Sequence, residues 1–79
     1  MMPLTMAGPG ESVQLVAVRG GRRLRRRLAD LGLTPGTSVR VVQVNPMGPL
    51  ILAFKDDVRL ALGRGMAHKI QVKPLTLSV

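Results

Sequence analysis

Two ten-residue segments of this chain nearly repeat each other, and each has the pattern of a turn that leads into a strand. PGESVQLVAV, residues 9–18, and PGTSVRVVQV, residues 35–44, are identical at six of their ten positions. Pro-Gly suits the two central positions of a type II turn, because Pro fixes φ and Gly tolerates a positive φ. The valines that follow alternate with polar residues, which is typical of a half-buried strand. An ancient duplication would explain the repeat, but we favour a shared turn-and-strand requirement.

The same alternation predicts which side chains of the two strands share a face. These are Val13, Leu15 and Ala17 in the first strand, and Val39, Val41 and Gln43 in the second, with Val42 and Val44 opposite.

Three further segments have a strand-like pattern: LILAF at 50–54, VRLAL at 58–62 and KIQVK at 69–73. NPMGP and the polar KDD, residues 55–57, are expected to be turns, and GRGMAH is expected to form one helical turn. Five short strands with such connections indicate a small sandwich or barrel, and closure into a barrel protects the strand edges. An SH3-like or an OB-like barrel fits this pattern.

A helical pattern lies between the two repeats. Leu24, Leu28 and Leu31 stand at i, i+4 and i+7, so they form one apolar stripe on a helix. Gly32 suits a left-handed residue just after the helix, and the proline of the next turn prevents continuation. We therefore expect a helix over residues 21–31 whose leucines pack on the barrel. The predicted fold is mostly β: a small five-stranded SH3-like barrel with one short α-helix packed over it, in a single domain of residues 1–79.

Composition limits how such a domain can be stabilised. The chain has 79 residues, no cysteine and one aromatic residue, Phe54, while 46% of its residues are apolar. Disulfides and thiolate metal sites are therefore excluded, and the core must be aliphatic. The sequence has no signal-peptide pattern and no apolar run near the roughly 20 residues of a membrane span. We expect a soluble, cytoplasmic protein.

A cluster of arginines covers the predicted helix, in a chain with a formal net charge of +8. It consists of Arg22, Arg23, Arg25, Arg26 and Arg27. The like-charge pairs Arg22–Arg26 and Arg23–Arg27 stand at i, i+4, where each costs about 0.2–0.5 kcal/mol. Two of the arginines also lie in the first turn, where the helix dipole favours acids. A helix selected only for stability would not carry this pattern, so the cluster indicates binding to an acidic partner.

Three kinds of acidic partner are open to such a cluster. Nucleic acid is favoured by the charge and by the RGG tripeptide at 19–21, but one aromatic residue cannot supply stacking platforms. An anionic membrane surface would attract the basic side chains, although the leucines of the helix are needed by the barrel. The third is an acidic protein face.

Catalysis is not expected, because no set of residues has the spacing of an active site. His68 is the only histidine, and Asp56 and Asp57 are adjacent in a predicted turn. The internal methionines Met47 and Met66 are expected to fill gaps in the core. We predict neither a cofactor nor a metal site; weak binding of a transition metal at His68 or at the two aspartates is left open.

The sequence resembles the FeoA family over nearly its whole length. The most specific stretch is RRLADLGLTPG, residues 26–36, followed by VRVV at 39–42. The opening at 4–11 and the closing segments at 60–67 and 70–72 are also similar to this family. The resemblance implies an SH3-like barrel that accompanies the FeoB ferrous-iron transporter.

This resemblance implies a cytoplasmic accessory protein of Fe²⁺ uptake that binds the cytosolic G-protein region of FeoB, close to an anionic membrane surface. The residues expected to bind the partner are the five arginines with Leu31, Gly32 and Leu33, joined by Met47 or Met66. The alternative is a small basic barrel that contacts the nucleic-acid backbone through the same helix. A homo-oligomer is left open, and the tail at 76–79 is apolar enough to join a strand edge.

Overall fold

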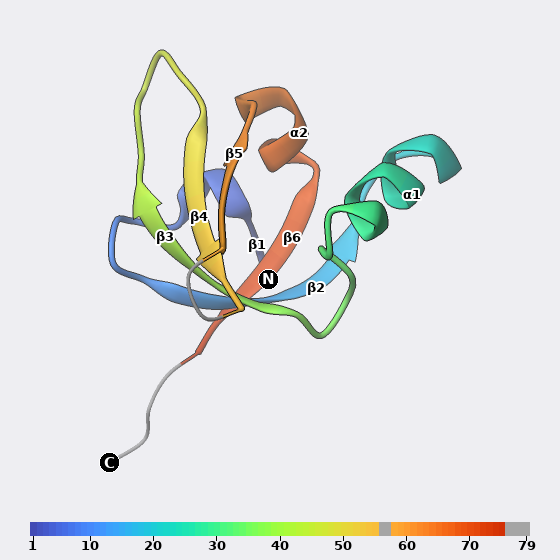
Figure 1. The fold of residues 1–79 in the computed structure, drawn as a ribbon, viewed down its shortest axis with the longest axis horizontal. Helices are drawn as coiled ribbons and strands as arrows, with labels where there is room; N and C mark the ends of the chain where they lie inside the picture. Colours follow the sequence, from blue (N-terminus) through green and yellow to red (C-terminus); the bar gives the residue numbers. More distant parts are fainter. Residues whose placement is uncertain (56–57, 76–79) are drawn as a thin grey trace.

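The structure is a computed structural model that describes residues 1–55 and 58–75. All the strands pair antiparallel in one sheet of order β1-β6-β2-β3-β4-β5, which curls into a barrel of the SH3-like kind (Figure 1). The elements are β1 (Met2–Pro3), η1 (Leu4–Met6), β2 (Ser12–Val18), α1 (Arg22–Asp30), β3 (Ser38–Gln43), β4 (Leu50–Phe54), β5 (Val58–Leu62), α2 (Arg64–His68) and β6 (Ile70–Pro74).

The two near-repeats become β2 and β3, which pair with each other about a local twofold axis. The fifth residues of the two segments face each other, and each Pro-Gly turn folds back onto the other strand. The amide of Gly10 donates to the carbonyl of Val41 at 2.7 Å, and the amide of Gly36 donates to that of Leu15 at 2.8 Å. Both glycines have a positive φ, +85° and +96°, as the predicted type II turns require. Equivalent hydrogen bonds in one strand pair thus account for the residues that the segments share.

Both strands also bulge at the same point of the repeat, and this changes which side chains face the core. The register shifts between Leu15 and Ala17 in β2 and between Val41 and Gln43 in β3, so one residue is extra in each strand. An extra residue reverses the alternation beyond it. Gln43, which was expected on the buried face, is therefore exposed, and Val44 packs against the core instead.

The interior is aliphatic, as composition predicts. Phe54 is the one buried aromatic side chain, and the core of the described residues contains no buried polar or charged side chain. The other core residues are Leu4, Ala7, Val13, Leu15, Leu28, Leu33, Val39, Val41, Leu50, Leu52, Leu62, Ala67, Ile70 and Val72. Stability must therefore come from packing of these side chains, while the charges lie outside.

The number of elements differs slightly from the prediction. The described residues form six strands, because the two-residue β1 pairs with β6. A strand that short has no periodic pattern, so only its pairing reveals it. The predicted turn in GRGMAH is the short helix α2. The rest of the turn expected at 55–57 and the apolar tail at 76–79 lie outside the described residues.

Helix α1 is attached to the barrel at one end and projects from it (Figure 1). Leu28 has no exposed surface, and Leu24 is half-buried against the core. Leu31 was expected in the same stripe, but 41% of its surface is exposed. The helix ends at Asp30, so Leu31 is its C-terminal cap and the chain turns away before its side chain reaches the core.

Replacing Leu28 by Ala should lower the free energy of unfolding by about 2–5 kcal/mol, because it opens a cavity in the core. Leu31→Ala is the matched control, since it removes the same atoms from an exposed site and should change stability by less than about 1 kcal/mol. Urea unfolding monitored by circular dichroism measures both. Equal losses in the two variants would contradict this attachment of α1.

Candidate docking site on the arginine-rich helix

The N-terminal end of α1 is not built for stability. Its N-cap is Gly21, no side chain caps it, and its first turn contains no acidic residue. The first helical hydrogen bond runs from the amide of Arg25 to the carbonyl of Gly21 at 3.2 Å. Arg22 and Arg23 place positive charge where the helix dipole is already positive. This end of α1 therefore carries an electrostatic cost that an anionic partner would relieve.

The C-terminal end of α1, in contrast, is fixed by a Schellman motif. The amide of Leu33 donates to the carbonyl of Leu28 at 2.8 Å, and the amide of Gly32 donates to that of Ala29 at 2.9 Å. Gly32 has a φ of +93°, which confirms the left-handed residue predicted there. The motif usually brings two apolar side chains together, and here both Leu28 and Leu33 lie in the core.

This motif corrects one residue of the predicted docking surface. Leu33 is only 1% exposed, so its side chain is not available to a partner. The signal for this burial was present in the sequence, since an apolar residue directly after the glycine of a Schellman motif packs back on the last turn. Leu31 and the half-buried Gly32 stay at the surface.

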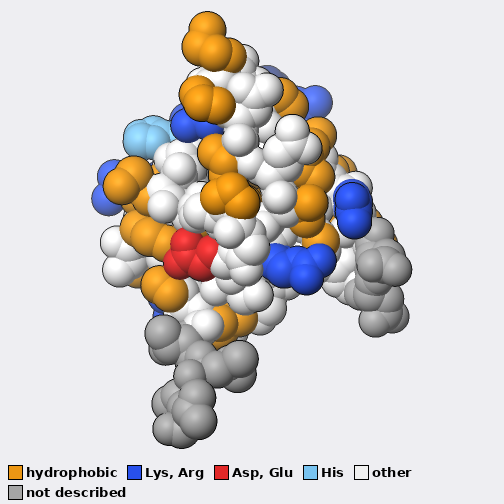
Figure 2. Space-filling model, turned by 90° about the vertical axis from the view of Figure 1, so that its left-hand side faces the viewer, with side chains coloured by type: hydrophobic (Ala, Val, Ile, Leu, Met, Phe, Trp, Pro, Cys, Tyr) orange, Lys and Arg blue, Asp and Glu red, His pale blue; other side chains and the backbone are white. Residues whose placement is uncertain are grey.

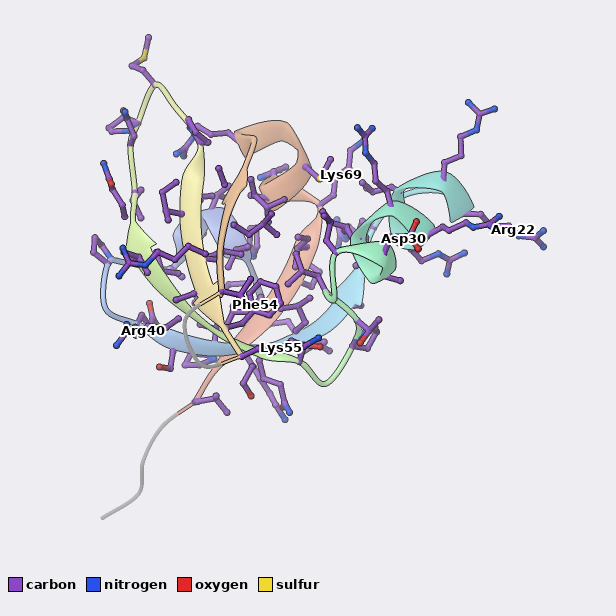
Figure 3. The ribbon with its side chains drawn as sticks, in the orientation of Figure 1. Arg22, Asp30, Arg40, Phe54, Lys55 and Lys69 are labelled. Carbon is purple, nitrogen blue, oxygen red and sulfur yellow. The ribbon has the colours of Figure 1, made fainter. Side chains whose placement is uncertain are left out.

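All five arginines of the cluster have exposed side chains. Arg22 lies at the end of α1 that is far from the barrel (Figure 3). At 3.6 residues per turn, the five positions cover an arc of about 200° around the helix axis. Leu24 and Leu28 occupy the remaining sector and face the barrel. Most of the free surface of α1 is therefore cationic.

The two methionines of the predicted surface have different environments. Met66 is half-buried against the core, in agreement with a gap-filling role. Met47 is 94% exposed, so that role is wrong for it. It belongs to the β3–β4 loop, which lies across the molecule from α1 (Figure 1). Leu31, the C-terminal cap of α1, therefore adjoins the helix that carries the arginines, whereas Met47 lies apart from them.

The described residues contain no cluster of three or more His, Cys, Asp or Glu side chains able to hold a metal ion. His68 is exposed at the end of α2, while Asp56 and Asp57 lie outside the described residues. In the part of the chain that the structure describes, no helix is long and apolar enough to span a bilayer.

A curled six-stranded sheet with a projecting basic helix places the chain among small SH3-like barrel proteins. The FeoA domain model matches residues 2–74, so the chain belongs to the FeoA family. This family takes part in ferrous iron transport and is not a known class of enzymes. No curated protein matches the chain.

Solved structures agree with this assignment. A crystal structure of an iron uptake regulatory protein (FeoA) is 39% identical, with a TM-score of 0.86 and coverage of 94% of this chain and 97% of that one. The FeoA protein from Chlorobium tepidum is 30% identical, with a TM-score of 0.83 and coverage of 95% and 71%. A manganese-dependent transcriptional repressor shares only the fold, at 20% identity and a TM-score of 0.85; 92% of this chain matches 36% of the repressor.

Replacing Gly32 by Ala should lower the free energy of unfolding more than replacing Gly36 by Ala. Both glycines have a positive φ, which costs a side chain about 1–2 kcal/mol. A Cβ at Gly32 would in addition meet Cε2 of Phe54 at 3.2 Å, while a Cβ at Gly36 meets nothing within 4 Å. Urea unfolding measures the two losses. Equal losses would show that the end of α1 does not press against the core.

Proposed function

We propose that this protein is a cytoplasmic accessory factor of ferrous iron uptake, and that it docks through α1 on the cytosolic G-protein region of a FeoB-type transporter. The proposal takes the whole chain, residues 1–79, as one binding domain without a cofactor. Family membership supports the role in iron transport. The observation that carries the docking surface is the projection of α1 from the barrel with five exposed arginines.

The chemistry of the helix defines the partner surface that it fits. Guanidinium groups bind carboxylates through paired, charge-assisted hydrogen bonds, so the partner surface should carry Asp and Glu side chains. Because the arginines cover about 200° of the helix, an acidic groove would contact more of them than a flat face would. Such contacts speed association and weaken with added salt.

Leu31 adds an apolar contact at the base of the helix. Its side chain is exposed beside Gly32, next to the point where α1 meets the barrel. Aliphatic surface beside arginines helps to exclude water from the charged contacts, which strengthens them.

The structure gives less support to binding of nucleic acid by the same helix. The one aromatic side chain, Phe54, is buried, so among the described residues no aromatic ring is free to stack on a base. Contacts to the phosphate backbone are still chemically suited to the arginines, and these would depend steeply on salt. Duplex DNA and RNA therefore belong in the binding test.

Reversing two charges on α1 tests the proposal. In the double variant Arg22→Glu/Arg26→Glu, affinity for the isolated FeoB G-protein domain should fall by at least about tenfold, because like charges now face acidic groups. The measurement is a binding titration at about 150 mM salt, a condition under which exposed charges farther apart than about 8 Å are screened.

The control is Arg40→Glu/Arg59→Glu, which changes the net charge equally. Both residues are exposed on the sheet, and Arg40 lies on the side of the barrel away from α1 (Figure 3). This control should keep most of the affinity. Equal losses of affinity in both variants would show that binding depends on net charge and not on the position of the arginines on α1. Tight binding to duplex nucleic acid without binding to the G-protein domain would replace the proposal with the nucleic-acid alternative.

A further inference from the structure

The β3–β4 loop carries the most exposed large apolar side chain among the described residues. Met47, at 94% exposure, stands between Pro46 and Pro49, which are also exposed. Hydrophobic side chains crowd the upper end of the molecule in Figure 2, the end at which Figure 1 places this loop. An isolated apolar group at the tip of a loop gains nothing for folding, because it is as exposed as in the unfolded chain.

The tip is nevertheless held in a defined shape. The side-chain oxygen Oδ1 of Asn45 accepts a hydrogen bond from the amide of Met47 at 3.0 Å. The backbone carbonyl of Asn45 accepts one from the amide of Gly48 at 3.2 Å. Nη1 of Arg64, from the start of α2, donates to the same carbonyl at 2.9 Å. These contacts fix the loop before it meets a partner, so binding through Met47 costs little ordering entropy.

The surroundings of the tip are basic. Residues 44–49 contain no acidic side chain, and Arg64 lies at the base of the loop. His68 and Lys69, both exposed, follow at the other end of α2. The β3–β4 loop and α2 lie together at the upper end of the molecule in Figure 1, while α1 projects to one side. The acidic side chain seen in Figure 2 lies near the middle of the molecule, away from this end.

We propose that this end of the molecule binds an anionic lipid bilayer, with Met47 inserted into the interface and the basic side chains at the headgroups. An apolar insertion and a basic surface are the two signals that together give a reversible peripheral attachment. The hydrogen bond from Arg64 joins the loop to α2, so one surface can contact Met47 and the basic side chains of α2 together.

A single tryptophan tests the insertion directly. The chain contains no Trp or Tyr, so Met47→Trp introduces the one strong fluorophore at an exposed site. With vesicles of phosphatidylglycerol and phosphatidylcholine, its emission should shift to shorter wavelength, because the indole leaves water. Val58→Trp is the control: Val58 is half exposed at the opposite end of the β4–β5 pair, and the emission of this variant should not shift.

Flotation with the same vesicles measures the contribution of Met47 to affinity. Met47→Asp should weaken binding by at least about fivefold, whereas Val58→Asp, with the same charge change, should weaken it by less than about twofold. Vesicles of pure phosphatidylcholine should bind neither variant nor the parent protein.

The proposal would be overturned if the parent protein did not bind anionic vesicles, or if the two Asp variants lost affinity equally. If the emission of the Met47→Trp variant shifts with the G-protein domain, but not with vesicles, the tip belongs in a protein pocket instead. Since the vesicles contain no transporter, these outcomes are independent of the docking of α1 on FeoB.

Discussion

The hydrogen bond from the amide of Leu33 to the carbonyl of Leu28, with both side chains in the core, holds helix α1, the proposed docking surface, on the barrel. Helix α1 has nine residues, fewer than the roughly 12–15 that an isolated helix needs in water, and its arginines repel one another. It forms because its last turn is fixed to the barrel. The first turns keep Leu24 against the core, and their other side chains are exposed and can carry charge.

The residues that stabilise this fold differ from those proposed to bind a partner. The core of the described residues is aliphatic, and the arginines stand outside it. Met47 likewise contributes no burial, because its loop is shaped by backbone and Asn45 contacts. Surface charges can therefore be altered with small effects on folding, and for this reason charge reversal reports on binding rather than on stability.

The sequence predicts those features that local chemistry determines. The Pro-Gly turns, the burial of Leu28 and the left-handed Gly32 follow from turn and helix preferences, and each is confirmed. The bulge that exposes Gln43 depends on pairing between distant strands, which no local pattern contains. The exposure of Met47 also escaped prediction, because an apolar residue in a turn has the same pattern whether it fills a gap or projects into water.

In the proposed complex, α1 is the surface that meets the transporter. Hydrogen–deuterium exchange of the full chain, alone and with a saturating excess of the FeoB G-protein domain, measures this directly. An uncapped, exposed helix should exchange quickly in the free protein and become protected in the complex, while β3 and β4 exchange at the same rates in both. Unchanged exchange in α1, or protection confined to the strands, would contradict the assignment of the docking surface to this helix.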